Sequence, residues 1–87
     1  MKKKNCVGVV GLGYVGLPLA VAFSESGYEV VGVDVNQERV DTLHYGNSYL
    51  GDISDEQVSQ LLDSGFLPTT EYAKLSEASH ISICVPT

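Results

Sequence analysis

Three glycines in the pattern G-x-G-x-x-G, Gly11, Gly13 and Gly16, constrain the fold of this chain more than any other feature. They follow a short run of small and β-branched residues, 5–10, and they open a segment whose apolar residues have helical spacing. A glycine turn between a buried strand and a helix is the context of a dinucleotide-binding fingerprint. Gly11 allows the tight turn, Gly13 lets a pyrophosphate approach the backbone, and Gly16 allows the helix to pack on the strand.

The remaining sequence alternates between patterns typical of buried strands and of helices. Strands are expected at 5–10, 29–33, 66–70 and 80–85, all buried except the third, which Pro68 places at a sheet edge. Helices are expected at 14–26, 36–45, 54–65 and 71–78, with inward apolar residues that include Leu19, Ala20, Phe23, Val40, Leu43, Val58, Leu61, Tyr72 and Leu75. This order predicts an α/β fold, a Rossmann-type parallel sheet of strand order 3-2-1-4 with helices on both faces.

The length of 87 residues bounds the architecture to one small domain. Four strands outline a dinucleotide cleft, but they are too few to close the sheet or to hold a substrate as well. We therefore expect residues 1–87 to be a partial, truncated domain, the amino-terminal portion of a longer enzyme. The fourth strand is then expected to keep an unpaired apolar edge, which favours association.

The charge balance argues against several kinds of partner. Eleven acidic residues stand against five basic ones, and three of the basic residues form the terminal run 2–4, so the net charge is −6. Such a surface repels phosphate backbones and anionic lipids, which predicts no nucleic-acid and no membrane-surface binding. Cys6 and Cys84 lie in apolar runs far apart without further ligands, so we expect buried free thiols in a reducing compartment, the cytoplasm, and no metal site.

The amino terminus superficially matches a secretory signal. The basic run 2–4, an apolar stretch and Ala20-Val21-Ala22 correspond to its three parts. However, the glycines and Pro18 interrupt the helix that a signal core forms. Their spacing fits the fingerprint better.

Asp34 completes the fingerprint, because it lies eighteen residues after Gly16 at the end of the second strand, near the usual offset of about 20. A carboxylate there accepts hydrogen bonds from ribose hydroxyls and repels a 2′-phosphate, so it favours NAD over NADP. The amino terminus of the first helix supplies N–H groups for the diphosphate. FAD sites share the pattern, and a purely structural turn with Asp34 as a cap is the plainer alternative.

Other polar residues give weaker signals. Thr87 follows the fourth strand, so its hydroxyl is expected to face the cofactor crevice unless it is an ordinary turn residue. His44 and His80 lie at element ends that suggest structural roles. The sequence offers no nucleophile, base and orienting group together, and we predict no catalytic residue in this chain.

Three segments carry a resemblance to a known family: 11–20 (GLGYVGLPLA), 33–36 with Arg39 and Val40, and 83–87 (ICVPT). They resemble the amino-terminal NAD-binding domain of the UDP-glucose/GDP-mannose dehydrogenase family. Segments 47–50 and 52–56 resemble the branch that oxidises UDP-N-acetylated hexosamines. The resemblance runs over essentially the whole chain.

The resemblance implies an NAD-dependent enzyme that oxidises the C6 alcohol of a nucleotide sugar to a carboxylate, with two NAD and a cysteine-bound intermediate. It implies that Tyr14 and Val15 line the pyrophosphate turn, that Asp34 holds ribose, and that Arg39 and Thr87 approach the cofactor. On sequence alone, Arg39 fits a solvated helix face equally well.

In the family, a further proline, a dimerising helical segment and a sugar-binding domain with the catalytic cysteine follow Thr87. We therefore expect this fragment to be inactive alone, and the full-length enzyme to be a homodimer or larger. Cys6 and Cys84 match strand positions of the family. Two alternatives stay open: the cofactor domain of a β-hydroxyacid dehydrogenase, which usually has Met where Val15 stands, and a free-standing dinucleotide-binding module or redox sensor.

Overall fold

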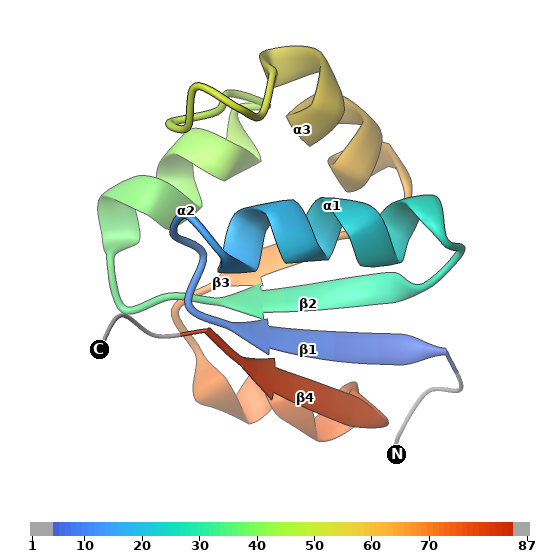
Figure 1. The fold of residues 1–87 in the computed structure, drawn as a ribbon. Helices are drawn as coiled ribbons and strands as arrows, with labels where there is room; N and C mark the ends of the chain where they lie inside the picture. Colours follow the sequence, from blue (N-terminus) through green and yellow to red (C-terminus); the bar gives the residue numbers. More distant parts are fainter. Residues whose placement is uncertain (1–4, 85–87) are drawn as a thin grey trace.

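Four parallel strands form one sheet in the order β3-β2-β1-β4 in the computed structural model, which describes residues 5–84 (Figure 1). The strands are β1 Cys6–Val10, β2 Glu29–Val33, β3 Leu67–Thr69 and β4 His80–Ile83. The helices are α1 Gly16–Glu25, α2 Gln37–His44, α3 Asp55–Asp63 and the 3-10 helix η1 Tyr72–Glu77. The predicted α/β class and the predicted strand order 3-2-1-4 are confirmed.

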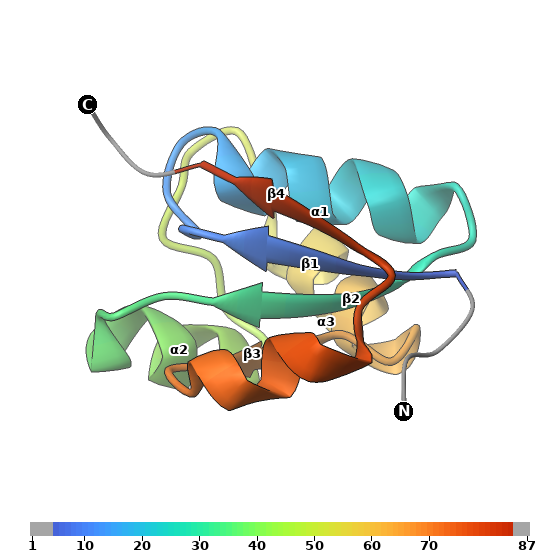
Figure 2. The ribbon, with the colours of Figure 1, turned by 90° about the horizontal axis from the view of Figure 1, so that it is seen from below.

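Helices cover both faces of the sheet, as predicted (Figure 2). On one face, Val7, Val9 and Val30 pack with α1, α2 and α3 in the larger apolar core. On the other face, Cys6 and Val31 pack with the η1 side in a smaller core. β1 is therefore buried along its whole length, because alternate side chains enter different cores.

Helix ends follow the sequence signals closely. The Asn36 side chain accepts a hydrogen bond from the Arg39 N–H and caps α2. Ser54 and Gln57 form the predicted capping box of α3. Pro68 lies in β3 at the sheet edge, where its missing N–H costs no ladder hydrogen bond.

The buried face of α1 differs from the predicted one. Its fully buried residues include Leu17, Ala20 and Val21, whereas Leu19 and Phe23 are only half-buried. The helix also begins at Gly16 instead of residue 14. Gly16 lies close against the Gly11 carbonyl, and with this face of the helix toward the turn, Leu17 and Val21 pack in the larger core against the sheet.

The prediction that the fourth strand is buried is wrong. Ile81 is 51% exposed and Ile83 is 71% exposed. Cys84, which was expected to be a buried thiol, is only partly buried. β4 pairs with β1 alone, so it forms the free edge of the sheet within the described residues, which confirms the predicted unpaired apolar edge. Its apolar side chains Ile81 and Ile83 therefore form an exposed surface among the described residues. Residue 85, the last of the predicted strand, lies outside the described residues.

The predicted helix at 71–78 is the 3-10 helix η1, and the inward position of Tyr72 is also wrong. Tyr72 is 52% exposed at the first turn of η1, while Leu75 is partly buried against the smaller core. Tyr72 is the first residue of η1, whereas Leu75 lies one turn further along, where the helix packs against the smaller core.

Gly16 is the position where a side chain costs most. A Cβ there would lie 1.5 Å from the Gly11 carbonyl oxygen, a backbone atom that cannot move away cheaply. We expect Gly16→Ala to lose more than about 4 kcal/mol of unfolding free energy and to leave the chain unfolded. Gly51→Ala is the matched control, because a Cβ at Gly51 meets no atom within 4 Å. Urea denaturation followed by circular dichroism measures both; a cooperative transition of Gly16→Ala would contradict the prediction.

Candidate dinucleotide-binding site

The glycine turn joins β1 to α1 at the carboxyl end of the sheet. Gly11 has a φ of 92°, a left-handed conformation that favours glycine, and its N–H donates to the Val33 carbonyl oxygen over 2.7 Å. This hydrogen bond ties the turn to the end of β2. Gly13 differs from the other two glycines, because the nearest atom to a Cβ there is Arg39 Nη1 at an ordinary 3.5 Å. The fold therefore does not require glycine at position 13, where a Cβ would lie in ordinary contact with Arg39.

The amino terminus of α1 has no side-chain cap. Val15 is the N-cap residue and accepts no hydrogen bond through its side chain, whereas Asn36 and Ser54 cap the other two α-helices. The first turn of α1 also contains no acidic residue. The partial positive charge of this helix end is therefore not neutralised locally, which suits a negatively charged ligand.

Asp34 lies directly after β2 and is buried, with 6% of its surface exposed. Its Oδ2 accepts the Leu12 N–H at 2.8 Å, and its Oδ1 accepts the Asn36 N–H at 2.8 Å. Arg39 Nη1 lies 3.3 Å from Oδ2 and forms an ion pair with it. Burial alone would raise the pKa of Asp34, but these hydrogen bonds and the Arg39 charge outweigh it and hold the pKa below its usual value.

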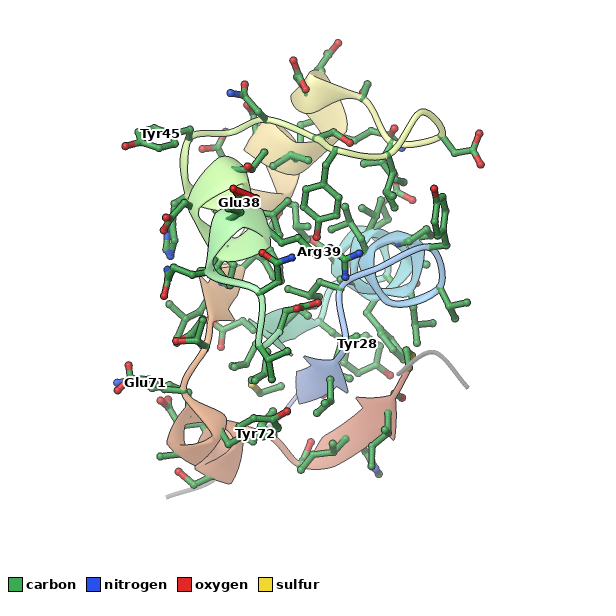
Figure 3. The ribbon with its side chains drawn as sticks, turned by 90° about the vertical axis from the view of Figure 1, so that its left-hand side faces the viewer. Tyr28, Glu38, Arg39, Tyr45, Glu71 and Tyr72 are labelled. Atoms are coloured by element: carbon green, nitrogen blue, oxygen red, sulfur yellow. The ribbon has the colours of Figure 1, made fainter. Side chains whose placement is uncertain are left out.

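Arg39 extends from α2 toward the glycine turn (Figure 3). Its guanidinium carbon lies 5.5 Å from the centre of the Tyr49 ring, a cation–π distance. The Tyr49 hydroxyl in turn donates to the Leu12 carbonyl oxygen. Arg39 is therefore held between Asp34 and Tyr49 and is not a freely solvated side chain.

A cleft of about 270 Å³ opens beside this group of residues. Figure 3 looks onto the carboxyl ends of the strands, with Arg39 and Tyr72 on opposite sides of the end of β1. The lining residues come from the ends of β1 and β2, the segments that follow these two strands, the start of η1 and the end of β4: Val10, Gly11, Gly13, Val33, Asp34, Val35, Asn36, Arg39, Tyr72 and Cys84. Exposed Val35 and Tyr72 offer apolar surface to a flat ring, while Asp34 and the turn offer polar contacts.

Chemically, this arrangement favours binding and not bond breaking. His44 and His80 are exposed and neither lines the cleft. Within residues 5–84, no group of three or more His, Cys, Asp or Glu side chains is placed to hold a metal ion. No helix in that same range is long and apolar enough to cross a membrane.

The sequence comparison decides the family. Residues 5–87 match the NAD binding domain of the UDP-glucose/GDP-mannose dehydrogenase family. The chain belongs to this family. Because the matched domain binds NAD, the comparison favours NAD over FAD as the cofactor.

Relatives and solved structures of the family agree with this assignment. The UDP-N-acetyl-D-mannosamine dehydrogenase of Salmonella typhi is 39% identical over 81 residues, which are 92% of this chain and 19% of the relative. The UDP-D-ManNAc dehydrogenase structure from Pyrococcus horikoshii superposes with a TM-score of 0.84 at 32% identity, covering 92% of this chain and 20% of that one. The GDP-mannose dehydrogenase of Pseudomonas aeruginosa has a TM-score of 0.82 at 30% identity, over 93% and 19%. The chain thus spans about a fifth of these dehydrogenases.

Most of the predicted site residues of this NAD-binding domain come together in the structure. Gly11, Gly13, Asp34 and Arg39 line one cleft, and Gly16 supports it from below the turn. Two predicted residues lie elsewhere on the turn: Tyr14, 84% exposed, lines a second hollow with Tyr49 and Leu50, and Val15 is also exposed. Thr87 lies outside the described residues.

Sequence reasoning missed several residues around the site, among them Val35, Tyr49, Tyr72 and Cys84. Tyr72 and Cys84 were expected to face the interior. The exposure of Val35 could have been predicted from its position. It is an apolar residue directly after Asp34, beyond the end of β2, where side chains no longer pack into the core. Tyr49 gives no comparable signal, because its contacts are with residues ten or more positions away.

The ionised Asp34 should make acid stability depend on this site. A carboxyl whose pKa is lowered in the folded state stabilises the fold above its unfolded pKa, near 3.8, and this stabilisation is lost as the pH falls through the folded value. Asp34→Asn places an N–H₂ group against donors, so it should cost about 1 to 3 kcal/mol at pH 7. The difference from the wild type should shrink below pH 3.8. Urea denaturation at pH 7, 5 and 3 measures it; a difference that does not vary with pH would contradict the prediction.

Proposed function

We propose that this chain binds NAD in the cleft at the carboxyl ends of β1 and β2. The observation that carries the proposal is the buried, ionised Asp34 beside the uncapped amino terminus of α1, with the backbone of Gly13 lining the same cleft. Asp34 suits a ribose hydroxyl, the uncapped helix terminus suits a diphosphate, and the glycine allows the diphosphate to approach the backbone closely.

Asp34 has a limited capacity for a ribose. A carboxylate offers about four acceptor positions, and Leu12, Asn36 and Arg39 use three of them. The remaining position, on Oδ1, suits one ribose hydroxyl. A 2′-phosphate would bring negative charge to the same oxygen, so the site should select NAD over NADP.

The other parts of the cofactor follow from this anchor. The diphosphate would lie over Gly13 and the first turn of α1, where Gly11 and Gly16 shape the backbone. Tyr14 and Val15 would flank it, and Thr87 would approach it from the end of the fourth strand, as the family resemblance implies. The adenine would lie between Val35, Arg39 and Tyr72, of which the two apolar residues are exposed at the cleft.

For the whole protein we propose a nucleotide-sugar 6-dehydrogenase that oxidises the C6 alcohol of a UDP-sugar to a carboxylate with two NAD. Bound NAD supplies the hydride acceptor. The names of the relatives, several of which are UDP-N-acetyl-D-mannosamine dehydrogenases, support an N-acetylated UDP-hexosamine as the substrate. Because the chain spans about a fifth of these enzymes, the sugar site and the catalytic groups belong to the remainder, and residues 1–87 alone should not turn over.

Two further proposals concern the setting of the enzyme. We place it in the cytoplasm, because its relatives are named as enzymes that use nucleotide sugars. We expect a homodimer or larger assembly for the full-length enzyme, with a nucleotide sugar as its partner and no nucleic acid or membrane.

Gly13→Ala separates binding from folding. The new methyl would meet only Arg39, at 3.5 Å, so the unfolding free energy should change little. It would also narrow the cleft that Gly13 lines and that we assign to the diphosphate. We expect at least about a tenfold loss of NAD affinity by isothermal calorimetry, equal to about 1.4 kcal/mol. Gly51→Ala serves as the control that adds the same methyl elsewhere. Unchanged NAD affinity in folded Gly13→Ala would refute this placement of the diphosphate.

Asp34→Ala tests the ribose assignment. Removal of the carboxylate should weaken NAD binding and relax the discrimination against NADP, because the negative charge that repels a 2′-phosphate is gone. Calorimetric titrations of NAD and NADP into wild type and variant measure the ratio of the two affinities. Circular dichroism should verify that the variant is folded, since it also loses the Leu12 hydrogen bond. An unchanged ratio would disprove the role of Asp34.

A further inference from the structure

We propose that Tyr49 is a positioning residue for the cofactor: its hydroxyl fixes the peptide group between Leu12 and Gly13 so that the Gly13 N–H is presented to the diphosphate. The inference rests on the proposed NAD site and adds to it a residue from the loop between α2 and α3. Tyr49 itself does not line the cleft.

Four contacts close a ring around the glycine turn. Asp34 accepts the Leu12 N–H, and the Leu12 carbonyl accepts the Tyr49 hydroxyl. The Tyr49 ring lies against the Arg39 guanidinium, which pairs with Asp34. This closed set of four contacts connects the turn, the end of β2, α2 and the α2–α3 loop, so each of these segments limits the movement of the others.

Because of the geometry of a peptide bond, this closed set of contacts also fixes the direction of the Gly13 N–H. In a trans peptide group the C=O and the N–H point in opposite directions, and the described residues contain no cis peptide bond. The Tyr49 hydroxyl holds the carbonyl of Leu12 on its own side. The N–H of Gly13, which belongs to the same peptide group, is therefore directed away from Tyr49. Gly13 lines the cleft.

Leu12 has little other freedom. Its side chain is fully buried in the larger core, and the two peptide groups that flank it are held by Asp34 and by Tyr49. The turn is thus set before a ligand arrives. Binding then avoids the free-energy cost of ordering the turn.

The α2–α3 loop can hold Tyr49 firmly enough for this role. The Ser48 N–H donates to Asp55 Oδ1 at 2.7 Å, and the Leu50 N–H donates to Ser48 Oγ at 3.0 Å. Ile53 anchors the loop in the larger core. Burial raises the pKa of Tyr49 to about 12, so its hydroxyl keeps the proton that it donates throughout the neutral range.

Two substitutions separate the hydroxyl from the ring. Tyr49→Phe removes the hydrogen bond to Leu12 and keeps the ring beside Arg39, while Tyr49→Leu removes both contacts. Tyr45→Phe is the matched control, because Tyr45 is exposed and points away from the molecule in Figure 3. For each 87-residue chain, NMR titrations measure the affinity for ADP, which has the diphosphate, and for adenosine, which lacks it.

We expect Tyr49→Phe to lose about five- to tenfold in ADP affinity, the size of one hydrogen bond, with adenosine affinity unchanged. Tyr49→Leu should lose at least as much, and Tyr45→Phe nothing. Wild-type affinity for ADP in Tyr49→Phe would overturn the proposal, and so would an equal loss for ADP and adenosine. If the wild type binds neither ADP nor NAD, the proposed function itself fails. If the wild type binds ADP and Tyr49→Phe binds it equally well, only the proposed role of Tyr49 fails.

A measurement on the wild type covers the case in which Tyr49→Phe does not fold. The Gly13 amide signal of the free protein should show no microsecond-to-millisecond exchange broadening, because the turn is already fixed. Broadening of that signal that disappears when ADP is added would show that the ligand orders the turn, and it would overturn the proposal.

Discussion

The hydrogen bond from the Leu12 N–H to the Asp34 carboxylate links the two halves of this domain. It connects the turn after β1 to the end of β2, and the Arg39 ion pair extends it to α2. Without the carboxylate, the turn would keep the Gly11 hydrogen bond to Val33 and the Tyr49 hydrogen bond to Leu12, but the Leu12 N–H would lose its acceptor. The residue that would recognise a ribose is thus also the one that shapes the diphosphate turn, so folding and cofactor recognition depend on the same charge.

Much of the architecture could be predicted from local signals. The glycine pattern, the capping residues Asn36 and Ser54, and Asp34 at the end of a buried strand each act over a few residues, and the structure places each where it was expected. Their agreement is understandable, because turn geometry and capping are decided by backbone conformation and short-range hydrogen bonds.

The remaining features depend on contacts between distant segments. In α1, Gly16 lies close against Gly11 and Leu17 is buried, whereas the spacing of apolar residues alone selected Leu19. The exposure of Ile83 follows from the position of β4 at an edge, which the small number of strands predicted, whereas the apolar pattern of the strand by itself predicted burial. Tyr49 joins the site through the Leu12 carbonyl, 37 residues away, and no local pattern indicates such a contact.

The unequal roles of the glycines also bear on how such domains are compared. A methyl at Gly16 would remove the fold, whereas a methyl at Gly13 would leave the ribbon almost unchanged. Two chains can therefore superpose closely while only one retains the capacity to accept a dinucleotide. For domains of this shape, overall similarity describes the scaffold, and the side chain at the second glycine position indicates whether the scaffold still has room for its ligand.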